Sequence, residues 1–172
     1  MAWRHVDTII EGRLYLGNIH AARSSRSLTE RRITHIVSVC NEPIPAELPE
    51  SGITHLRIPV EDVDFADILI WLPQACGFIN QAVRAGGVVL VHCYQGLSRS
   101  ATVVAAYLMC TRRIDAAQAM LEVRQAREQV WFSAGFHEQL VLFELCRYQP
   151  SESCPFYVGW RQRIAAHLAG QQ

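Results

Sequence analysis

The sequence contains no lysine, no long apolar run and no excess of charge of either sign. Sixteen arginines balance sixteen acidic residues over 172 positions, so the formal net charge is zero. A chain without a global positive field is not drawn by long-range attraction to nucleic acid or to an acidic membrane. No window approaches the roughly 18 apolar residues that a membrane span requires. We therefore expect neither a membrane nor nucleic acid as a direct partner, and a bound anion must be held by a local site.

Sequence patterns of metal modules, disulfide frameworks and secretion are also absent. The six cysteines are widely and unevenly spaced, without a CxxC pair or a histidine at zinc-ligand spacing. We accordingly expect no metal site, no disulfide framework and no cofactor. The segment Met1–Asp7 lacks the basic and apolar regions of a signal peptide. These features together predict an intracellular protein, located in the cytoplasm, the nucleus or both.

The length and composition fit one folded domain. Half of the residues are hydrophobic and 19% are charged, which excludes a disordered or low-complexity chain. We expect a single domain over residues 1–172, with a core from about 8 to 149. The segment 150–172 is predicted to be an appendage in which a turn-like stretch precedes a short helix over 160–168.

Short apolar segments alternate with helical patterns along the chain. Strands are predicted at 13–17, 33–39, 55–59 and 88–92. The last of these is apolar throughout, which is typical of a strand buried on both faces. Helices are predicted after residue 17, at 67–84, at 100–110, from 115 to about 126 and from 135 to about 148. The expected caps are a capping box at Ser27 and Glu30 in the first helix, Asp115 in the fourth and Ser133 in the last. This alternation predicts an α/β domain with a mostly parallel central sheet flanked by helices.

The segment from His92 to Ser100 joins the buried strand to the buried helix and has the spacing HCx5RS. A short loop that enters a helix directs backbone N–H groups and the positive helix end toward one point, which suits an oxyanion. These groups and Arg99 favour the thiolate form of Cys93, which would make it a nucleophile. Arg99 can also hold two phosphate oxygens with its planar fork of donors. The sequence therefore predicts a phosphate-binding loop made of Tyr94, Gln95, Gly96, Leu97, Ser98 and Arg99.

The sequence VHCYQGLSRSATVVAAYLM at 91–109 resembles the cysteine-based dual-specificity protein phosphatases of the protein tyrosine phosphatase superfamily. LYLGN at 14–18, ITHIVSV at 33–39 and GFHEQL at 135–140 support the likeness, which spans nearly residues 12–145. It implies metal-independent hydrolysis of phosphotyrosine and phosphoserine/threonine monoesters in phosphoprotein substrates, in which Cys93 forms a phosphocysteine that water then hydrolyses. It also implies that the Ser100 hydroxyl assists departure of the thiolate. Ser100 can equally cap the start of the helix, and the two roles are compatible.

The family protonates the leaving oxygen with an aspartate about thirty residues before the cysteine. Four acidic residues lie in this region: Glu61, Asp62, Asp64 and Asp67. Asp62, 31 residues before Cys93, matches the family position best, and Asp64 is the second candidate. Asp64 can instead be a solvated loop residue, and Asp67 a helix cap. His92 is predicted to orient the loop through hydrogen bonds rather than to transfer protons.

Two segments depart from or extend the family pattern. Arg127-Glu128 and Phe132-Ser133 stand where the family often has Arg-Pro and Pro-Asn, which affects loop packing near the site rather than its chemistry. The tail at 144–148 and 155–160 resembles a fungal and animal subfamily in which a zinc-binding domain follows and whose roles include ribosome maturation. That likeness implies pre-ribosomal particles as partners. These 172 residues contain no such zinc domain, so either the chain is part of a longer protein or the likeness is superficial.

Three other functions are compatible with the same loop. An RNA 5′-triphosphatase or a phosphoinositide phosphatase would use the same cysteine and arginine, although phosphoinositide enzymes usually carry lysines inside the loop and this loop has none. Arginines clustered at 23–32 and 112–113 can form either an RNA-binding patch or solvated helix faces. The third alternative is a binding or assembly module in which phosphatase activity is incidental.

Overall fold

One mixed sheet of five strands forms the centre of the molecule in the computed structural model, which describes residues 4–171. Residues 1–3, part of the segment considered as a signal peptide, and residue 172 lie outside the described residues. In spatial order the strands are β1 (Val6–Ile10), β2 (Leu14–Gly17), β5 (Val89–His92), β3 (His35–Ser38) and β4 (Thr54–Arg57). β1 is antiparallel to β2, and the other neighbouring pairs are parallel. The predicted α/β fold with a mostly parallel sheet is confirmed.

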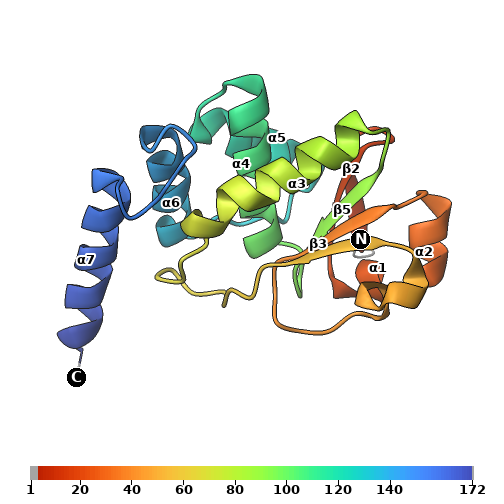
Figure 1. Cartoon of the computed structure of the whole chain (residues 1–172), viewed down its shortest axis with the longest axis horizontal. Coiled ribbons are helices and arrows are strands. Elements are labelled where there is room, and N and C mark those ends of the chain that lie inside the picture. The colour runs from red at the N-terminus through yellow and green to blue at the C-terminus, as the bar shows by residue number, and fades with distance from the viewer. Residues whose placement is uncertain (1–3, 172) are drawn as a thin grey trace.

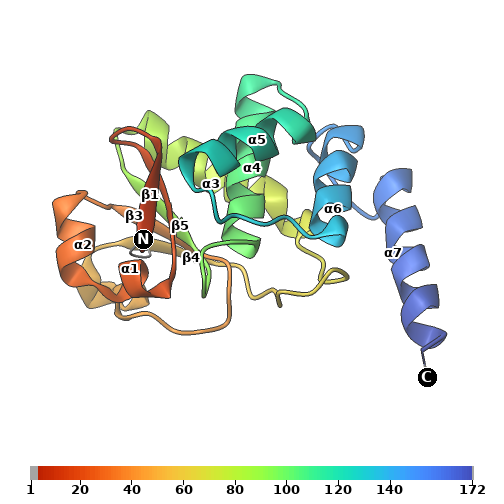
Figure 2. The ribbon, with the colours of Figure 1, turned by 180° about the vertical axis from the view of Figure 1, so that it is seen from behind.

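Helices cover both faces of this sheet (Figures 1 and 2). The short helices α1 (Ile19–Arg23) and α2 (Ser25–Glu30) lie on one face, together with the 3-10 turns η1 (Pro45–Glu47) and η2 (Pro49–Ser51). The other face is covered by η3 (Leu69–Trp71), α3 (Leu72–Arg84), α4 (Arg99–Arg112), α5 (Ala116–Ala126) and α6 (Ala134–Leu145). The last helix, α7 (Pro155–Ala169), packs beside α6 at the end of the molecule away from the sheet (Figure 2).

The central strand β5 separates two hydrophobic cores. Val89 and Val91 pack in the larger core under α3–α6, whereas Val88 and Leu90 pack in the smaller core under α1 and α2. This alternation follows from the period of two residues in a strand. It explains why the segment is apolar at every position and confirms that the strand is buried on both faces.

The parallel strands place their following loops at one edge of the sheet. The segment after β3, the loop after β4 and the loop after β5 therefore meet there, since β5, β3 and β4 are adjacent and parallel. In open α/β sheets this carboxyl edge is where ligands bind. The buried helix α4 leaves the same edge, so its N-terminus also points at the meeting place of the three loops (Figure 1).

Two predicted helix starts are wrong. Ser27 is inside α2 rather than at its cap: Asn18 caps α1, and the Ser24 hydroxyl accepts from the Ser27 backbone N–H at 3.1 Å to cap α2. Glu30 pairs with Arg26 instead, at 2.8 Å. The last helix begins at Pro155, five residues before its predicted start, because proline is well suited to the first turn of a helix.

Other boundaries differ at the sheet edge and at the end of α6. β1 was not predicted; it is a short edge strand in which only Asp7 is buried, so it lacks a clear pattern. α6 ends at Leu145 because Arg147 and Tyr148 adopt left-handed backbone conformations with φ of 52° and 62°. The caps predicted at Asp115 and Ser133 are confirmed. Within residues 4–171, the structure holds no helix with the length and apolar character needed to cross a membrane.

Candidate active site

Cys93 lies at the bottom of the loop between β5 and α4, with only 2% of its surface exposed. Its Sγ accepts a hydrogen bond from the backbone N–H of Gly96 at 3.2 Å and lies 3.0 Å from the hydroxyl of Ser100. Gly96 has a φ of +73°, and a Cβ there would lie 2.5 Å from the carbonyl oxygen of Gly17. The loop thus needs glycine both for its backbone conformation and for its close contact with β2. The result is a buried thiol surrounded by hydrogen-bond donors.

Arg99, the first residue of α4, connects the loop of Cys93 to the segment after β4. Its Nη1 donates to the carbonyl oxygen of Val60 at 3.0 Å, and its side chain lines the same cavity as Cys93. The buried Nε of Arg99 and the buried hydroxyl of Ser98 have no hydrogen-bond partner within residues 4–171. Buried donors are normally paired, so these two groups are candidates to bind an oxyanion in the cavity that Ser98, Arg99 and Cys93 line.

Arg127 supports the loop that follows Cys93 and is itself only 2% exposed. Its Nε donates to the carbonyl oxygen of Gly96 at 2.9 Å, and its Nη2 donates to that of Gln95 at 3.4 Å. The guanidinium also pairs with Asp7 of β1 at 2.9 Å. Arg127 thus holds two carbonyl groups of the loop away from the cavity. These hydrogen bonds stabilise the loop conformation in which the N–H groups face the cavity.

His92 is fully buried and belongs to a directional chain of hydrogen bonds. Its Nδ1 lies 3.1 Å from the carbonyl oxygen of Cys93, and a carbonyl only accepts, so Nδ1 carries the hydrogen. Burial lowers the pKa of His92 to about 4, so the ring is neutral and its Nε2 accepts from the Ser38 hydroxyl at 2.6 Å. Ser38 must then accept from Nε2 of His55 at 2.8 Å. The chain from His55 through Ser38 to His92 therefore orients the start of the phosphate loop.

The four acidic candidates after β4 lie in different places. Asp62 lines the cavity that contains Cys93 and Arg99. Glu61 accepts from the side chain of Asn41 at 2.9 Å, and Asp67 Oδ1 accepts from the backbone N–H of Ile70 at 3.1 Å, so Asp67 caps the turn before α3. Asp64 packs through its backbone against Gly135 at the start of α6. The structure thus brings Asp62, and not the other three, to the cavity wall.

Gln139 of α6 fixes the far half of this acidic loop. Its Oε1 accepts from the backbone N–H groups of Ile68 and Leu69 at 3.1 and 3.0 Å, and its Nε2 donates to the carbonyl oxygen of Ala66 at 2.9 Å. Gly135 makes this packing possible, because a Cβ there would overlap three backbone and side-chain atoms of Asp64. The position of the loop that carries Asp62 is therefore set by α6.

Glu42 places a carboxylate on the wall of the same cavity. Burial alone would raise the pKa of this carboxyl group, but backbone N–H donors, the Cys40 thiol and the charge of Arg99 lower it below its ordinary value. Glu42 is consequently an anion that faces Arg99. It opposes any second negative group on a bound phosphate ester.

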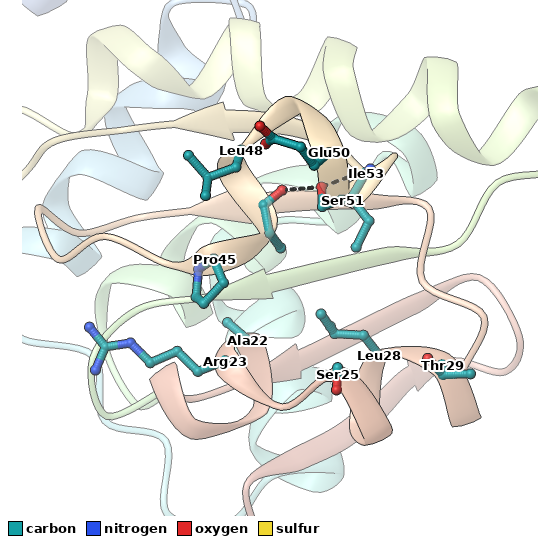
Figure 3. Close-up of a pocket in the computed structure, with 11 residues that line it drawn as sticks. Ala22, Arg23, Ser25, Leu28, Thr29, Pro45, Leu48, Glu50, Ser51 and Ile53 are labelled. Atoms are coloured by element: carbon teal, nitrogen blue, oxygen red, sulfur yellow. Dashed lines mark hydrogen bonds between the residues drawn. The ribbon is translucent and has the colours of Figure 1, made fainter.

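The cavity over Cys93 has a volume of about 320 Å³ and is lined by Glu42, Asp62, Cys93, Tyr94, Gln95, Ser98 and Arg99. A larger cavity of about 470 Å³ lies between the helices α1–α2 and the segment 45–53 (Figure 3). Its lining is mainly aliphatic, with Arg23 and Glu50 at its rim and no cysteine or histidine. Within the described part of the chain, no cluster of three or more His, Cys, Asp or Glu side chains could hold a metal ion. The nucleophile and the acidic residue meet only in the smaller cavity.

The predicted phosphate-loop residues take different positions around Cys93. Tyr94 and Gln95 are exposed at the rim, Ser98 and Arg99 are buried in the wall, and Gly96 supplies an N–H to the thiol. Leu97 contacts the loop after α5, where its carbonyl accepts from the backbone N–H of Trp131 at 2.9 Å. Ser100 is not a helix cap, because α4 begins at Arg99 with Ser98 in the cap position. The Ser100 hydroxyl instead faces Cys93.

Five residues near the site were not found from the sequence as parts of it. They are Ser38, Glu42, His55, Arg127 and Gln139. Ser38 ends β3 and Glu42 follows it. The carboxyl end of β3 was an available signal, because β3 lies beside β5, the strand that Cys93 follows. Gln139 lies within the quoted segment GFHEQL, where only the likeness to a family indicated importance.

Comparisons with known proteins agree with this geometry. The family model described as the dual specificity phosphatase catalytic domain matches residues 14–146. The dual specificity protein phosphatase Mpk3 of Drosophila melanogaster is 40% identical over 137 residues, which are 79% of this chain and 33% of the relative. Dual specificity protein phosphatase 1 of Arabidopsis thaliana is 37% identical and covers 79% of this chain and 68% of its own length. The crystal structure of human DUSP28 superimposes with a TM-score of 0.77 at 34% identity, over 86% of this chain and 97% of that one. The chain thus spans only a third of the length of the Drosophila relative.

Proposed function

Because the chain belongs to the dual specificity phosphatase family, we propose that it is a protein phosphatase that hydrolyses phosphotyrosine and phosphoserine/threonine through a phosphocysteine on Cys93, without a metal. The observation that carries the proposal is the buried Cys93 thiol, which lines one cavity together with Asp62 and with Ser98 and Arg99, whose buried donors are unpaired among the described residues. This arrangement combines a nucleophile, an oxyanion site and an acid.

In the first step the thiolate of Cys93 attacks phosphorus, so that a sulfur–phosphorus bond forms while the ester oxygen–phosphorus bond breaks. Asp62 gives its proton to the departing oxygen. Arg99 and the loop N–H groups hold the non-bridging oxygens of the transferring phosphoryl group. In the second step water attacks phosphorus and gives a proton to Asp62. The sulfur–phosphorus bond then breaks, and the Ser100 hydroxyl, 3.0 Å from the sulfur, donates to the released thiolate.

The charges around the cavity favour monophosphorylated protein substrates over the other phosphate compounds considered. The loop contains no lysine, and Glu42 is an anion that would oppose a further phosphate group. The cavity volume of about 320 Å³ is sufficient for one phosphorylated side chain.

The test compares wild-type protein with Cys93→Ser, Asp62→Asn and the matched control Asp64→Asn, all in excess chelator. Substrates are p-nitrophenyl phosphate, whose leaving group needs little protonation, and phosphotyrosine and phosphothreonine peptides. We expect Cys93→Ser to abolish turnover and to retain peptide binding. Asp62→Asn should lower kcat on phosphothreonine peptide by about 10²–10⁴ and much less on the nitrophenyl ester, with Asp64→Asn close to wild type. Full activity of Cys93→Ser, or a folded wild type inactive on all three substrates, would overturn the proposal.

A further inference from the structure

Two cysteines far from the phosphate loop lie in direct contact where α6 meets α7. Cys146 follows the last residue of α6, and Cys154 immediately precedes α7. Their sulfur atoms are 2.7 Å apart, and both are free thiols. Cys146 is buried, whereas Cys154 is partly exposed to solvent. The views in Figures 1 and 2 agree that the two helices lie side by side, joined by the short connection that carries both residues.

The distance between these sulfurs suits a disulfide better than a metal site. Two thiolates on one tetrahedral zinc ion, each about 2.3 Å from it, are about 3.8 Å apart. A disulfide bond is about 2.05 Å long, so closing the pair requires the sulfurs to approach by well under one ångström. Within residues 4–171, no third histidine, cysteine or acidic side chain joins the pair to complete a metal cluster.

The two thiols differ in their surroundings in the way that a reactive pair requires. Burial alone would raise the pKa of Cys154, but its hydrogen bond with Cys146 and the backbone N–H groups of Tyr157 and Phe156 lower it below the ordinary value. For Cys146, burial and the hydrogen bond with Cys154 raise the pKa to about 12. Cys154 is therefore the more acidic thiol and the more accessible sulfur, while Cys146 stays protonated until it reacts.

We propose that Cys146 and Cys154 form a second reactive site, a dithiol that hydrogen peroxide oxidises to a disulfide between the end of α6 and the start of α7, and that a thiol reductant restores. The Cys154 thiolate attacks one peroxide oxygen, the oxygen–oxygen bond breaks, and uptake of one proton yields Cys154 sulfenic acid and water. The Cys146 sulfur then attacks the sulfenic sulfur; its proton and the departing hydroxyl leave as a second water. The cysteine pair loses two electrons and two protons, and the peroxide gains them.

The disulfide would add a covalent link to a helix that already packs on the domain through Tyr157 and Trp160, which are buried in the larger core. α7 contacts α6, and the Tyr157 hydroxyl donates to Oδ2 of Asp67, the residue that caps the turn after the acidic loop. Closing the covalent ring from Cys146 to Cys154 removes conformations of the unfolded chain. We expect the oxidised form to melt about 5–10 °C higher than the reduced form.

Peptide mapping of the full chain tests the proposal directly. A Cys93→Ser background removes the thiol of the phosphate loop, so that peroxide consumption reports the remaining cysteines. After treatment with one equivalent of hydrogen peroxide, free thiols are blocked and the protein is cut with trypsin. Arg147 lies between the two cysteines, so a disulfide would join peptide 128–147 to peptide 148–161. We expect this linked pair, its loss on treatment with dithiothreitol, and the higher melting temperature.

Variants of the pair distinguish it from the other thiols. Cys154→Ser should abolish both the linked peptides and the shift in melting temperature, and serine is itself a good helix cap, so this variant should fold. The matched control Cys40→Ser, which removes a fully buried free thiol, should retain both. A disulfide between Cys76 and Cys110 instead, a Cys154 oxidised to sulfinic acid with Cys146 still free, or no reaction of either residue would overturn the proposal.

Discussion

Replacing Arg127 by methionine should damage stability and turnover through two separable routes. Arg127 is 2% exposed and donates to the carbonyls of Gly96 and Arg4, each at 2.9 Å, while pairing with Asp7 at 2.9 Å. Methionine keeps much of the length and removes every donor. Asp7 is then left buried, with only the solvent-exposed Arg4 nearby at 3.4 Å. Breaking a buried ion pair on one side costs about 3–5 kcal/mol, so we expect the free energy of unfolding to fall by about 3–4 kcal/mol.

A second substitution separates the effect of the unpaired Asp7 carboxylate from the effect of the lost hydrogen bonds to the loop. In the double variant Arg127→Met with Asp7→Leu, no buried carboxylate remains, and about 2 kcal/mol of the loss should return. The carbonyl of Gly96 still lacks its charged donor. A hydrogen bond to a charged group contributes about 1.5–3 kcal/mol, so kcat/KM should stay about 10–100-fold below wild type in both variants.

Urea unfolding and initial rates on p-nitrophenyl phosphate measure these two effects on the same preparations. The matched control is Arg124→Met, the same chemical change on the exposed face of α5, where Arg124 stacks on Phe132. It should change stability by less than about 1 kcal/mol. The reasoning is refuted if Arg127→Met costs no more than Arg124→Met, or if the double variant recovers full kcat/KM.

Two further predictions concern the acidic loop and the buried histidine. Gly135→Ala forces a Cβ into the backbone of Asp64 and should lower kcat about tenfold on phosphothreonine peptide but little on p-nitrophenyl phosphate. The control is Gly159→Ala, because nothing lies near the added Cβ there. Equal losses on both substrates would contradict the interpretation. Burial lowers the pKa of His92 to about 4. Between pH 6.5 and 4 the unfolded chain therefore binds a proton that the folded chain does not, so the free energy of unfolding decreases as the pH is lowered through this range. Urea unfolding at pH 7 and 4.5 should show that wild type loses about 2–3 kcal/mol more than His92→Gln, and an unchanged difference between the two proteins would contradict the assignment.

The location of the candidate site could be predicted because its central residues are neighbours in the sequence. Cys93, Gly96, Arg99 and Ser100 lie within eight positions, and a strand followed by a helix fixes their relative directions. Asp62 came from the likeness to a family rather than from local pattern. Its side chain reaches the cavity only because β4 lies two strands from β5 in a parallel sheet.

The supporting residues could not be predicted because their partners are distant in the sequence. Arg127 contacts Gly96 and Asp7, which lie 31 and 120 positions away in the sequence. In the sequence, Arg127 was noted only because Glu128 follows it where the family often has a proline. Ser38 and His55 are polar residues in strands, and only the register of β3 between β4 and β5 reveals that they form one chain with His92. Local patterns also misplaced caps where serines repeat, as at Ser24 and Ser27.

The geometry of Arg99 links phosphate binding to the position of the acid. One end of its guanidinium donates to the carbonyl of Val60, two residues before Asp62, while its buried Nε is left for a phosphate oxygen. Glu42 adds a negative charge near Arg99, and the hydrogen bond to Val60 holds the guanidinium in place before any substrate binds. A rigid arginine of this kind loses little conformational freedom when phosphate arrives. In the proposed reaction, the residue that binds the transferred group therefore also positions the segment that carries Asp62, the proposed proton donor to the leaving oxygen.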